Sequence, residues 1–319
     1  MKYHYIVFGY ECDYFEVMFK DAIDELGVEY IKNPIKDSTH NSFLTALYNV
    51  HNNSYLNAIY NIPGKDKWYH LYYQKKHTDP LCFVFLICWF DSRYEKLFIY
   101  LKQNYPNAKL VLYLEDIVAS RPAFDHKLEV YFDEIITYDK GDSDKYNYRY
   151  YPTFMSKIEI PAANTKYDLC FIGVAKQRIS LIHSVFDYLK HKNIKQDFVV
   201  CRKPKEIDKV MGIKYKKFNM SYKEYLKHVA CSKCILEIMQ DNATGFTLRT
   251  WEALLYNKKL LTNNKLIKEC EYFNEKQFAY FKTAEDIDPA FFSEDLFKST
   301  FDPKSISPIN FFQFLDKLL

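Results

Sequence analysis

Residues 234–264 contain the side chains with the clearest capacity for chemistry. Gly245 stands between an apolar segment and a predicted helix that begins near Thr247. Glycine lets backbone N–H groups approach a ligand, and a helix amino terminus offers unpaired donors with a partial positive charge. Thr247 and Arg249 add a hydroxyl and a guanidinium there, and Glu252 adds a carboxylate one turn later. These groups suit a nucleotide-sugar site; the alternative is an ordinary strand–helix–strand unit with a solvated Arg and Glu.

A second glycine-marked helix start lies at residues 171–178, FIGVAKQR. Gly173 ends a predicted strand, and Lys176 and Arg178 stand where the next helix begins. Two basic, glycine-marked helix starts in one half of the chain make a better anion site than either alone. We therefore expect both to contact a diphosphate, while a pair of basic residues flanking an exposed turn is the alternative.

Carboxylates that could act as a general base follow the predicted strands of the first half: Glu11, Asp13, Asp91, Glu115 and Asp116. A base for an acceptor hydroxyl belongs at the carboxyl end of a parallel strand. Asp13 and Asp91 are the strongest candidates. Each has a structural alternative, because Asp91 also precedes a helix and is a natural N-cap.

Other catalytic chemistries have no matching motif. The nine histidines show no HxxH or HxxxH spacing, and no GxSxG nucleophile motif is present. The CxxC at Cys231 and Cys234 has no second ligand pair, and it leads from a predicted helix into a strand, unlike a redox CxxC. We therefore expect no metal site and no bound cofactor, and the scattered cysteines suit a reducing cytoplasm.

Short apolar blocks alternate with helical patterns along both halves of the chain. Strands are expected at residues 3–8, 28–31, 56–62, 81–90, 108–114, 134–138, 168–172, 197–201, 234–239, 259–262 and 278–281. A first helix is expected after Gly9 and through Leu26. Further helices are expected at 42–50, 93–103, 123–131, 178–190, 222–230, 247–256 and 311–319. Such alternation predicts an α/β fold with two Rossmann-like, doubly wound parallel-sheet domains facing a cleft.

The expected division is an acceptor-side domain at residues 1–155, a donor domain at 156–305 and a terminal helix at 306–319 packing back on the first domain. The polar, tyrosine-rich segment 140–166 is the expected linker. The longest apolar run, residues 81–90, is too short to span a bilayer, and no signal peptide is apparent.

The formal charge of +3 is too close to neutral for a dedicated duplex-binding protein. Residues 201–223 are locally basic, with eight Lys or Arg against two acidic residues. This segment is either a solvated face or a surface attracted to an anionic membrane. We therefore expect no nucleic-acid partner and a cytoplasmic protein, with peripheral contact to the inner membrane face as a further expectation.

Three segments resemble GT-B glycosyltransferases, in particular bacterial enzymes of capsule or lipopolysaccharide biosynthesis. They are YDLCFIGVAKQR at 167–178, SYKEYL with SKCILE at 221–237, and TGFTLRTWEAL at 244–254 followed by KKLLTN. The resemblance covers the second half well and the first half only in pattern. The residues that it implies for donor binding are Gly173, Lys176, Arg178, Thr244, Gly245, Thr247, Arg249 and, for the ribose, Glu252.

The resemblance implies metal-independent transfer of a sugar from a nucleotide-sugar to a glycan or lipid-linked acceptor. Arg249 is expected to stabilise the leaving diphosphate, and Asp13 or Asp91, chosen from their positions after predicted strands, to deprotonate the acceptor hydroxyl if the reaction inverts. Retaining members carry a second Glu where this chain has Thr244, so the stereochemistry stays open. Asp142-Ser-Asp144 matches a metal-binding DxD only as letters. A nucleotide-sugar epimerase-like enzyme of the same fold and a non-catalytic glycan- or nucleotide-binding scaffold are the alternatives.

Overall fold

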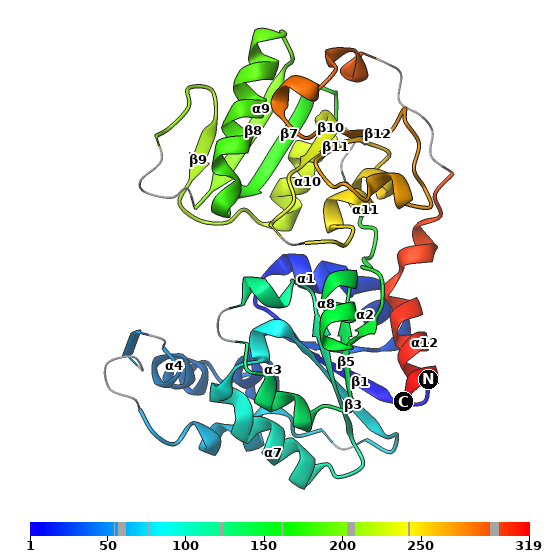
Figure 1. The fold of residues 1–319 in the computed structure, drawn as a ribbon. Coiled ribbons are helices and arrows are strands. Elements are labelled where there is room, and N and C mark those ends of the chain that lie inside the picture. The colour runs from blue at the N-terminus through cyan, green and yellow to red at the C-terminus, as the bar shows by residue number, and fades with distance from the viewer. Residues whose placement is uncertain are drawn as a thin grey trace. The chain divides into compact units, whose positions relative to one another are not determined.

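The computed structural model describes residues 1–53, 55–56, 62–75, 77–121, 124–160, 163–202, 208–241, 243–293 and 300–319. The chain forms two compact units, each with one six-stranded sheet (Figure 1). The first comprises Met1–Tyr138, Asp142–Tyr151 and Pro308–Leu319, and the second comprises Asp139–Gly141 and Pro152–Ser307. All strand pairs in both sheets are parallel, which confirms the predicted α/β class with two Rossmann-like sheets.

The sheet of the first unit has the strand order β2-β1-β3-β4-β5-β6. Its strands are β1 (His4–Phe8), β2 (Glu29–Ile31), β3 (Leu81–Leu86), β4 (Lys109–Leu114), β5 (Glu134–Thr137) and β6 (Arg149–Tyr150). All six residues of β3 are buried, as expected for a strand covered on both faces. The strand order reverses between β1 and β3, the place where open parallel sheets commonly bind ligands.

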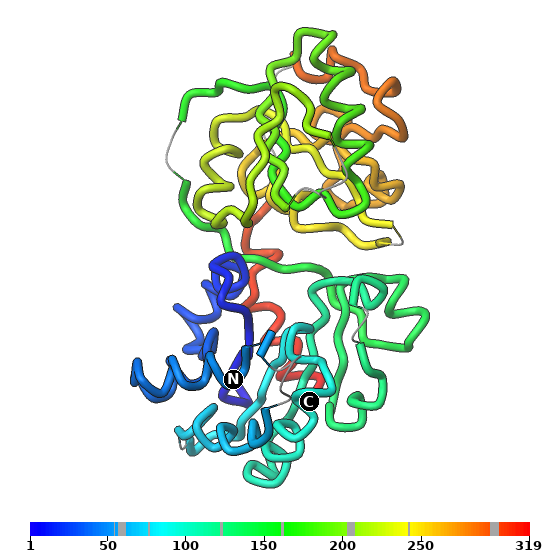
Figure 2. Tube along the Cα trace, turned by 90° about the vertical axis from the view of Figure 1, so that its left-hand side faces the viewer, coloured from blue at the N-terminus to red at the C-terminus, as the bar shows by residue number. Residues whose placement is uncertain are grey.

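The first unit's helices are α1 (Asp13–Met18), α2 (Lys20–Leu26), α3 (Pro34–Thr39), α4 (Ser42–His51), α6 (Tyr69–Tyr72), α7 (Glu95–Asn104), α8 (Lys140–Tyr146) and α12 (Pro308–Leu318). The last of these, α12, brings the carboxyl end of the chain back beside the amino end (Figure 2). Phe311 and Phe312 are fully buried, and the Phe312 ring lies 4.8 Å from that of Tyr5. The Asp316 carboxylate also accepts a 2.7 Å hydrogen bond from the Tyr5 hydroxyl.

The sheet of the second unit has the strand order β12-β11-β10-β7-β8-β9. Its strands are β7 (Tyr167–Val174), β8 (Gln196–Cys201), β9 (Lys214–Lys216), β10 (Ser232–Glu237), β11 (Lys259–Thr262) and β12 (Phe278–Tyr280). Its α-helices are α9 (Ile179–His191), α10 (Tyr222–Ala230) and α11 (Leu248–Leu255). This is the Rossmann order 3-2-1-4-5-6, and its reversal lies between β7 and β10.

Several predicted elements differ from the structure. The strand predicted at 81–90 ends at Leu86, because the next N–H, that of Ile87, donates to the Glu115 carboxylate at 2.9 Å and a 3₁₀ turn follows. The predicted linker at 140–166 is wrong in part, since α8 and β6 form within it despite its polar sequence. Strand β9 was not predicted. The strand predicted at 56–62 falls mostly outside the described residues.

The remaining bulk features concern cysteines and membranes. All eight cysteines are described, and all are free. Five of them are buried, which agrees with cysteine acting as a small apolar side chain. Within the described ranges, no helix has both the length and the apolar run that crossing a bilayer requires.

Candidate functional site

The candidate site lies at the carboxyl edge of the second sheet, where β7 and β10 are neighbours and the strand order reverses. Ligands of open α/β sheets bind outside the carboxyl ends of the strands at such a point. Gly173 stands near the end of β7, Glu237 ends β10, and α11 begins at Leu248 after its N-cap Thr247. Both glycine-marked segments singled out in the sequence therefore reach this edge.

Arg249 connects the start of α11 to the end of β7. Its Nη2 atom donates a 2.7 Å hydrogen bond to the Ile172 carbonyl, and its guanidinium lies 5.6 Å from the centre of the Phe171 ring. A Cβ atom at Gly173 would lie 2.7 Å from Nη2, so this approach requires glycine. The Nε atom of Arg249 is buried and has no hydrogen-bond partner among the described residues. A buried, unsatisfied donor on a cation at this edge is a feature that a bound anion would satisfy.

Lys176 and Arg178 follow β7 and bind the segment that follows β10. The Lys176 ammonium donates to the Gln240 side chain at 2.7 Å, and Lys176 itself has a positive φ of 47°. Arg178 donates to the carbonyls of Val174 and Ile238 at 2.6 and 2.5 Å. These bonds tie the ends of the two central strands together. Arg178 thus has a structural task in this conformation, and its predicted diphosphate contact stays a prediction.

Glu237 is the centre of a buried hydroxyl network that sequence reasoning did not single out. It is 1% exposed, and its carboxylate accepts hydrogen bonds from the hydroxyls of Thr247, Thr250 and Thr262. These bonds fix the N-cap of α11, and with it the position of Arg249, relative to the strand ends. A charged residue closing the apolar strand CILE was the available signal.

The backbone N–H groups of Thr244 and Gly245 are already paired. The carboxylate of Asp139, which is 1% exposed, accepts from these groups at 2.7 and 3.0 Å and from the Thr244 hydroxyl at 3.0 Å. This loop therefore does hold an anionic group, but one supplied by the chain itself. A diphosphate could use the same donors only by displacing Asp139, so the predicted roles of Thr244 and Gly245 stay predictions.

Glu252 lies within α11 and is only 2% exposed. The Tyr225 hydroxyl, from α10, donates to its Oε2 atom at 2.5 Å. Burial raises the pKa of Glu252 to about 7, against the lowering effects of the Tyr225 hydrogen bond and the Arg249 charge. The predicted ribose contact stays a prediction, and it would require ribose hydroxyls to reach a carboxylate that is buried in this conformation.

The two carboxylates predicted as bases in the first unit stand at helix starts. Asp91 accepts from the Arg93 N–H at 2.9 Å and from the Arg93 guanidinium at 2.8 and 3.0 Å. Burial works to raise the pKa of Asp91, but the hydrogen bonds from Arg93 outweigh it and hold the pKa below its ordinary value. This geometry favours the capping role that was the alternative for Asp91. Asp13 is the half-buried first residue of α1, and its catalytic role stays a prediction.

Glu115, directly after β4, has properties that suit a general base better. Tyr10 donates to its Oε1 atom, and Arg121 donates to the Tyr10 hydroxyl. The residue as a whole is only half-buried, yet burial of the carboxylate raises its pKa to about 7, against the opposing hydrogen bonds from Tyr10 and the Ile87 N–H. A carboxylate with a pKa near neutrality exchanges protons efficiently at physiological pH. Glu115 was among the five sequence candidates but was ranked below Asp13 and Asp91.

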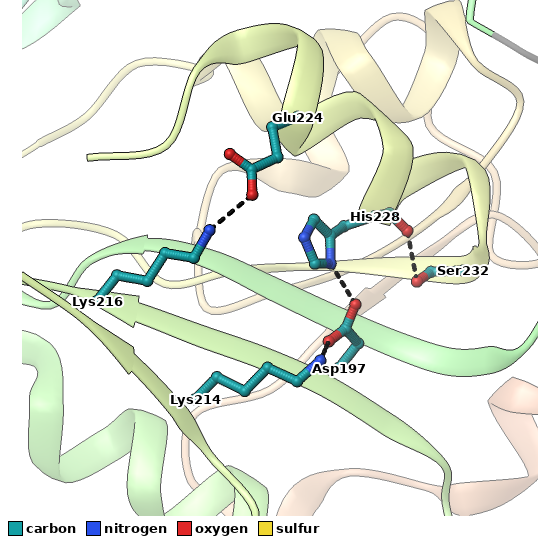
Figure 3. A network of polar contacts seen from close by, with 6 residues as sticks. All are labelled: Asp197, Lys214, Lys216, Glu224, His228 and Ser232. Atoms are coloured by element: carbon teal, nitrogen blue, oxygen red, sulfur yellow. Dashed lines mark hydrogen bonds and ion pairs between the residues drawn. The ribbon is translucent and has the colours of Figure 1, made fainter. Parts of the chain in front are cut away.

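A second polar network in the second unit resembles a catalytic constellation without having its geometry (Figure 3). His228 Nδ1 pairs with Asp197, which also accepts from Lys214 at 3.1 Å. Ser232, however, donates to the main-chain carbonyl of His228 at 2.8 Å rather than to its ring. Asp197 lies near the amino end of β8, the edge opposite to the candidate site. The network holds α10 and β9 to β8, and Ser232 is not placed as a nucleophile.

The comparisons with known proteins bear on the fold. No protein-family model matches the sequence, and no curated protein matches it significantly. A solved structure of a DNA-modifying β-glucosyltransferase, studied with and without uridine diphosphoglucose, is 14% identical and has a TM-score of 0.52; the match covers 99% of this chain and 95% of that one. An α-glucosyltransferase in complex with UDP and a 13-mer DNA is 12% identical with a TM-score of 0.50, covering 82% and 80% of the two chains.

A third solved structure, of accessory secretory proteins 1, 2 and 3 from Streptococcus pneumoniae, is 11% identical with a TM-score of 0.47. The match covers 80% of this chain but only 55% of that chain, so this protein spans about half the length of the chain that it matches there. At these identities the likenesses establish architecture and nothing finer. The two parallel-sheet units of this chain have the GT-B fold.

Proposed function

We propose that this protein is a metal-independent glycosyltransferase that uses a nucleotide-sugar donor. The donor diphosphate binds at the carboxyl edge of the second sheet, over Gly173 and beside Arg249. The observation that carries the proposal is the buried Arg249 Nε without a hydrogen-bond partner at the strand-order reversal. The shared fold supports it, because two solved structures with this fold are glucosyltransferases, one solved with UDP and one studied with uridine diphosphoglucose.

The chemistry that this edge supports is electrostatic stabilisation of a leaving diphosphate. As the bond to the sugar breaks, negative charge develops on the diphosphate, and a preorganised guanidinium stabilises that charge more than it stabilises the bound donor. Glu237 and its threonine hydroxyls keep α11 in place, so Arg249 does not need to reorganise during the reaction. Lys176, near the same edge, supplies a second positive charge. Diphosphate contacts by Gly173, Arg178, Thr244, Gly245 and Thr247 belong to the same proposal.

Deprotonation of the acceptor hydroxyl is assigned to a carboxylate of the first unit. Asp13 and Asp91 are the sequence-based candidates, and we add Glu115 because its pKa is raised to about 7. Asp91, with its pKa held low by Arg93, is a weaker base than Glu115.

For the acceptor we propose a glycan or lipid-linked oligosaccharide of surface-polysaccharide biosynthesis, modified at the cytoplasmic membrane face. The near-neutral charge of +3 supports this choice over a nucleic acid. Modification of DNA is the second candidate, because two of the similar structures, a DNA-modifying β-glucosyltransferase and an α-glucosyltransferase in complex with a 13-mer DNA, have DNA named as target or partner. The acceptor assay therefore includes DNA that carries the HMU base as one arm, and incorporation of labelled sugar there would replace the glycan assignment.

Donor binding is tested first by thermal unfolding with a panel of nucleotide-sugars, beginning with UDP-glucose. A ligand that binds only the folded protein raises the melting temperature, and at a given concentration a tighter ligand raises it further. We expect at least one nucleotide-sugar to stabilise the parent protein and Arg249→Ala to abolish that stabilisation. Gly173→Ala should weaken it as well, since the added Cβ would displace the Arg249 guanidinium.

The matched control is Arg149→Ala, which removes an exposed arginine paired with Glu134 in the first unit. This variant should respond to the donor like the parent. Unliganded melting temperatures show whether each variant is folded. If Arg249→Ala and Gly173→Ala both bind the donor like the parent, the site assignment is wrong. Turnover of the donor without any acceptor would indicate the epimerase-like alternative, and binding without any release of nucleoside diphosphate the non-catalytic scaffold.

A further inference from the structure

Three residues that are far apart in the sequence lie together at the amino edge of the first sheet. His4 is the first residue of β1, Glu29 is the first residue of β2, and His77 lies in the segment that leads to β3. These three strands are neighbours in the order β2-β1-β3. The cluster is at the edge opposite to the carboxyl-end carboxylates Glu115 and Asp91, so it forms no part of the site described above.

The ligand atoms of the cluster are close enough to share one ion. His4 Nε2 lies 2.8 Å and His77 Nε2 lies 3.4 Å from the same Glu29 Oε1 atom. All three atoms lie within 4.8 Å of one another. In a tetrahedral zinc site with bonds of about 2.0–2.1 Å, neighbouring ligand atoms are separated by roughly 3.4 Å. Small side-chain movements would therefore convert this arrangement into a three-ligand metal site.

The surroundings of the cluster indicate a ligand site, because the hydrogen bonds among its side chains are incomplete. His77 Nε2 is buried and has no hydrogen-bond partner among the described residues, although it faces Glu29. The two imidazole rings are stacked, with centroids 3.8 Å apart and an interplanar angle of 18°, so both nitrogens approach the carboxylate from one side. The side chains of His4, Glu29 and His77 are each about one-fifth exposed, which leaves room for water as a fourth ligand.

The other contacts of Glu29 are compatible with metal binding. Lys75 pairs with Oε2 at 2.7 Å, and the Tyr73 hydroxyl lies 3.4 Å from Oε1. A carboxylate that binds a metal through one oxygen commonly has its other oxygen held by a second group, which orients it. Lys75 can fulfil that role without leaving its present partner.

We propose that His4, Glu29 and His77 bind one divalent transition-metal ion, with zinc as the best-suited ion. Two imidazoles and one carboxylate favour zinc and its neighbours over Mg²⁺ and Ca²⁺, which prefer oxygen ligands. The ion joins the amino ends of β1 and β2 to the segment before β3, and it stabilises the first unit. The sequence predicted no metal site, because His4 and His77 are 73 positions apart and only the folded sheet brings them together.

The test uses the full chain and Zn²⁺ alone, with binding measured by calorimetry and folding by thermal unfolding. We expect one zinc ion per chain and a rise in melting temperature of about a few degrees at saturating zinc. His4→Ala, His77→Ala and Glu29→Gln should each weaken zinc binding by at least about 10-fold and remove the stabilisation. The matched control is His126→Ala, since His126 and Glu129 form a histidine–glutamate pair to which the described part of the chain adds no third metal-ligating side chain.

Cobalt substitution distinguishes metal binding at this cluster from metal binding at the cysteines, of which Cys12 is exposed. Bound Co²⁺ should give visible bands without thiolate charge transfer, and the three variants should lose those bands. The proposal is overturned if the parent does not bind zinc, if the three variants bind it like the parent, or if thiolate charge transfer dominates the cobalt spectrum. Since the cobalt spectrum is recorded on the parent protein, it remains decisive even if a variant fails to fold.

Discussion

Each unit contains a glutamate paired with a tyrosine hydroxyl, and an arginine lies beside each pair. In the first unit Tyr10 donates to Glu115 and Arg121 donates to Tyr10. In the second unit Tyr225 donates to Glu252, and the charge of Arg249 lowers the pKa of Glu252. In both units burial outweighs these effects and raises the pKa of the glutamate to about 7.

The two groups differ in where the carboxylate stands. Glu115 directly follows a strand at the carboxyl edge of its sheet and is half-buried, whereas Glu252 is 2% exposed within α11 and faces α10. A base must reach the proton that it removes, so a shifted pKa is useful for catalysis only on an accessible group. On this placement we propose Glu115, at a sheet edge, as the proton-transfer group and Glu252 as a supporting residue, although their local chemistry is nearly the same.

The largest expected difference between the two glutamates is in turnover. Glu115→Gln should lower kcat by about 100-fold or more, because general-base catalysis contributes on that order, while donor-induced thermal stabilisation stays at the parental level. Glu252→Gln should keep kcat within a few-fold of the parent. Both values come from a sugar-transfer assay with saturating donor. Loss of donor stabilisation in Glu252→Gln would instead support the ribose contact predicted from the sequence, and equal kcat losses would remove the distinction.

The next difference concerns stability as a function of pH. The pKa of Glu252 is raised from an ordinary 4.5 to about 7, so the folded state favours the protonated form. The parent should therefore lose up to roughly 3 kcal/mol of stability as the pH rises from 4.5 through 7. Glu252→Gln, which cannot ionise, should lack this loss. Urea unfolding at several pH values measures it.

Asp197 should change the stability of the protein with pH in the opposite direction. Burial works to raise its pKa, but the hydrogen bonds from His228 and Lys214 outweigh it and hold the pKa below its ordinary 3.8. Its stabilising effect is thus present at neutral pH and is lost as the pH falls through the lowered value. Asp197→Asn should cost about 2 kcal/mol at pH 7. The difference from the parent, read from the same urea series, should shrink below pH 4, and a constant difference would contradict the assigned ion pairs.

The fold was largely predictable from the sequence, because buried parallel strands are continuous apolar blocks. Strand β11 was predicted with its observed bounds at residues 259–262, and α10 likewise at 222–230. Elements with mixed composition were missed: β9, KYK, exposes both of its lysines, and α8, KGDSDKY, has no apolar face. No hydrophobic period marks such segments, and only contacts made by the folded chain stabilise them.

The candidate site was predictable in place but not in detail. Gly173 and Arg249 were identified by their types and positions, and the structure brings them to one sheet edge. The pairing of Asp139 with the N–H groups of Thr244 and Gly245 joins positions about 100 residues apart, so spacing could not reveal it. The ranking of Asp91 above Glu115 rested on position alone, since burial and the partners that shift a pKa depend on the tertiary structure.

The smallest expected effects come from removing the tyrosine hydroxyls. Tyr10→Phe and Tyr225→Phe each remove a hydrogen bond that lowers the pKa of the adjacent glutamate, so both pKa values should rise further above 7. Each substitution should cost about 1–2 kcal/mol at neutral pH, because one buried acceptor loses its partner.

In the first unit the alkaline shift should also appear in the pH profile of kcat, since Glu115 is the proposed base. In the second unit it should appear only in the pH dependence of unfolding. A shift of the kcat profile in Tyr225→Phe that Tyr10→Phe does not show would exchange the roles of the two glutamates.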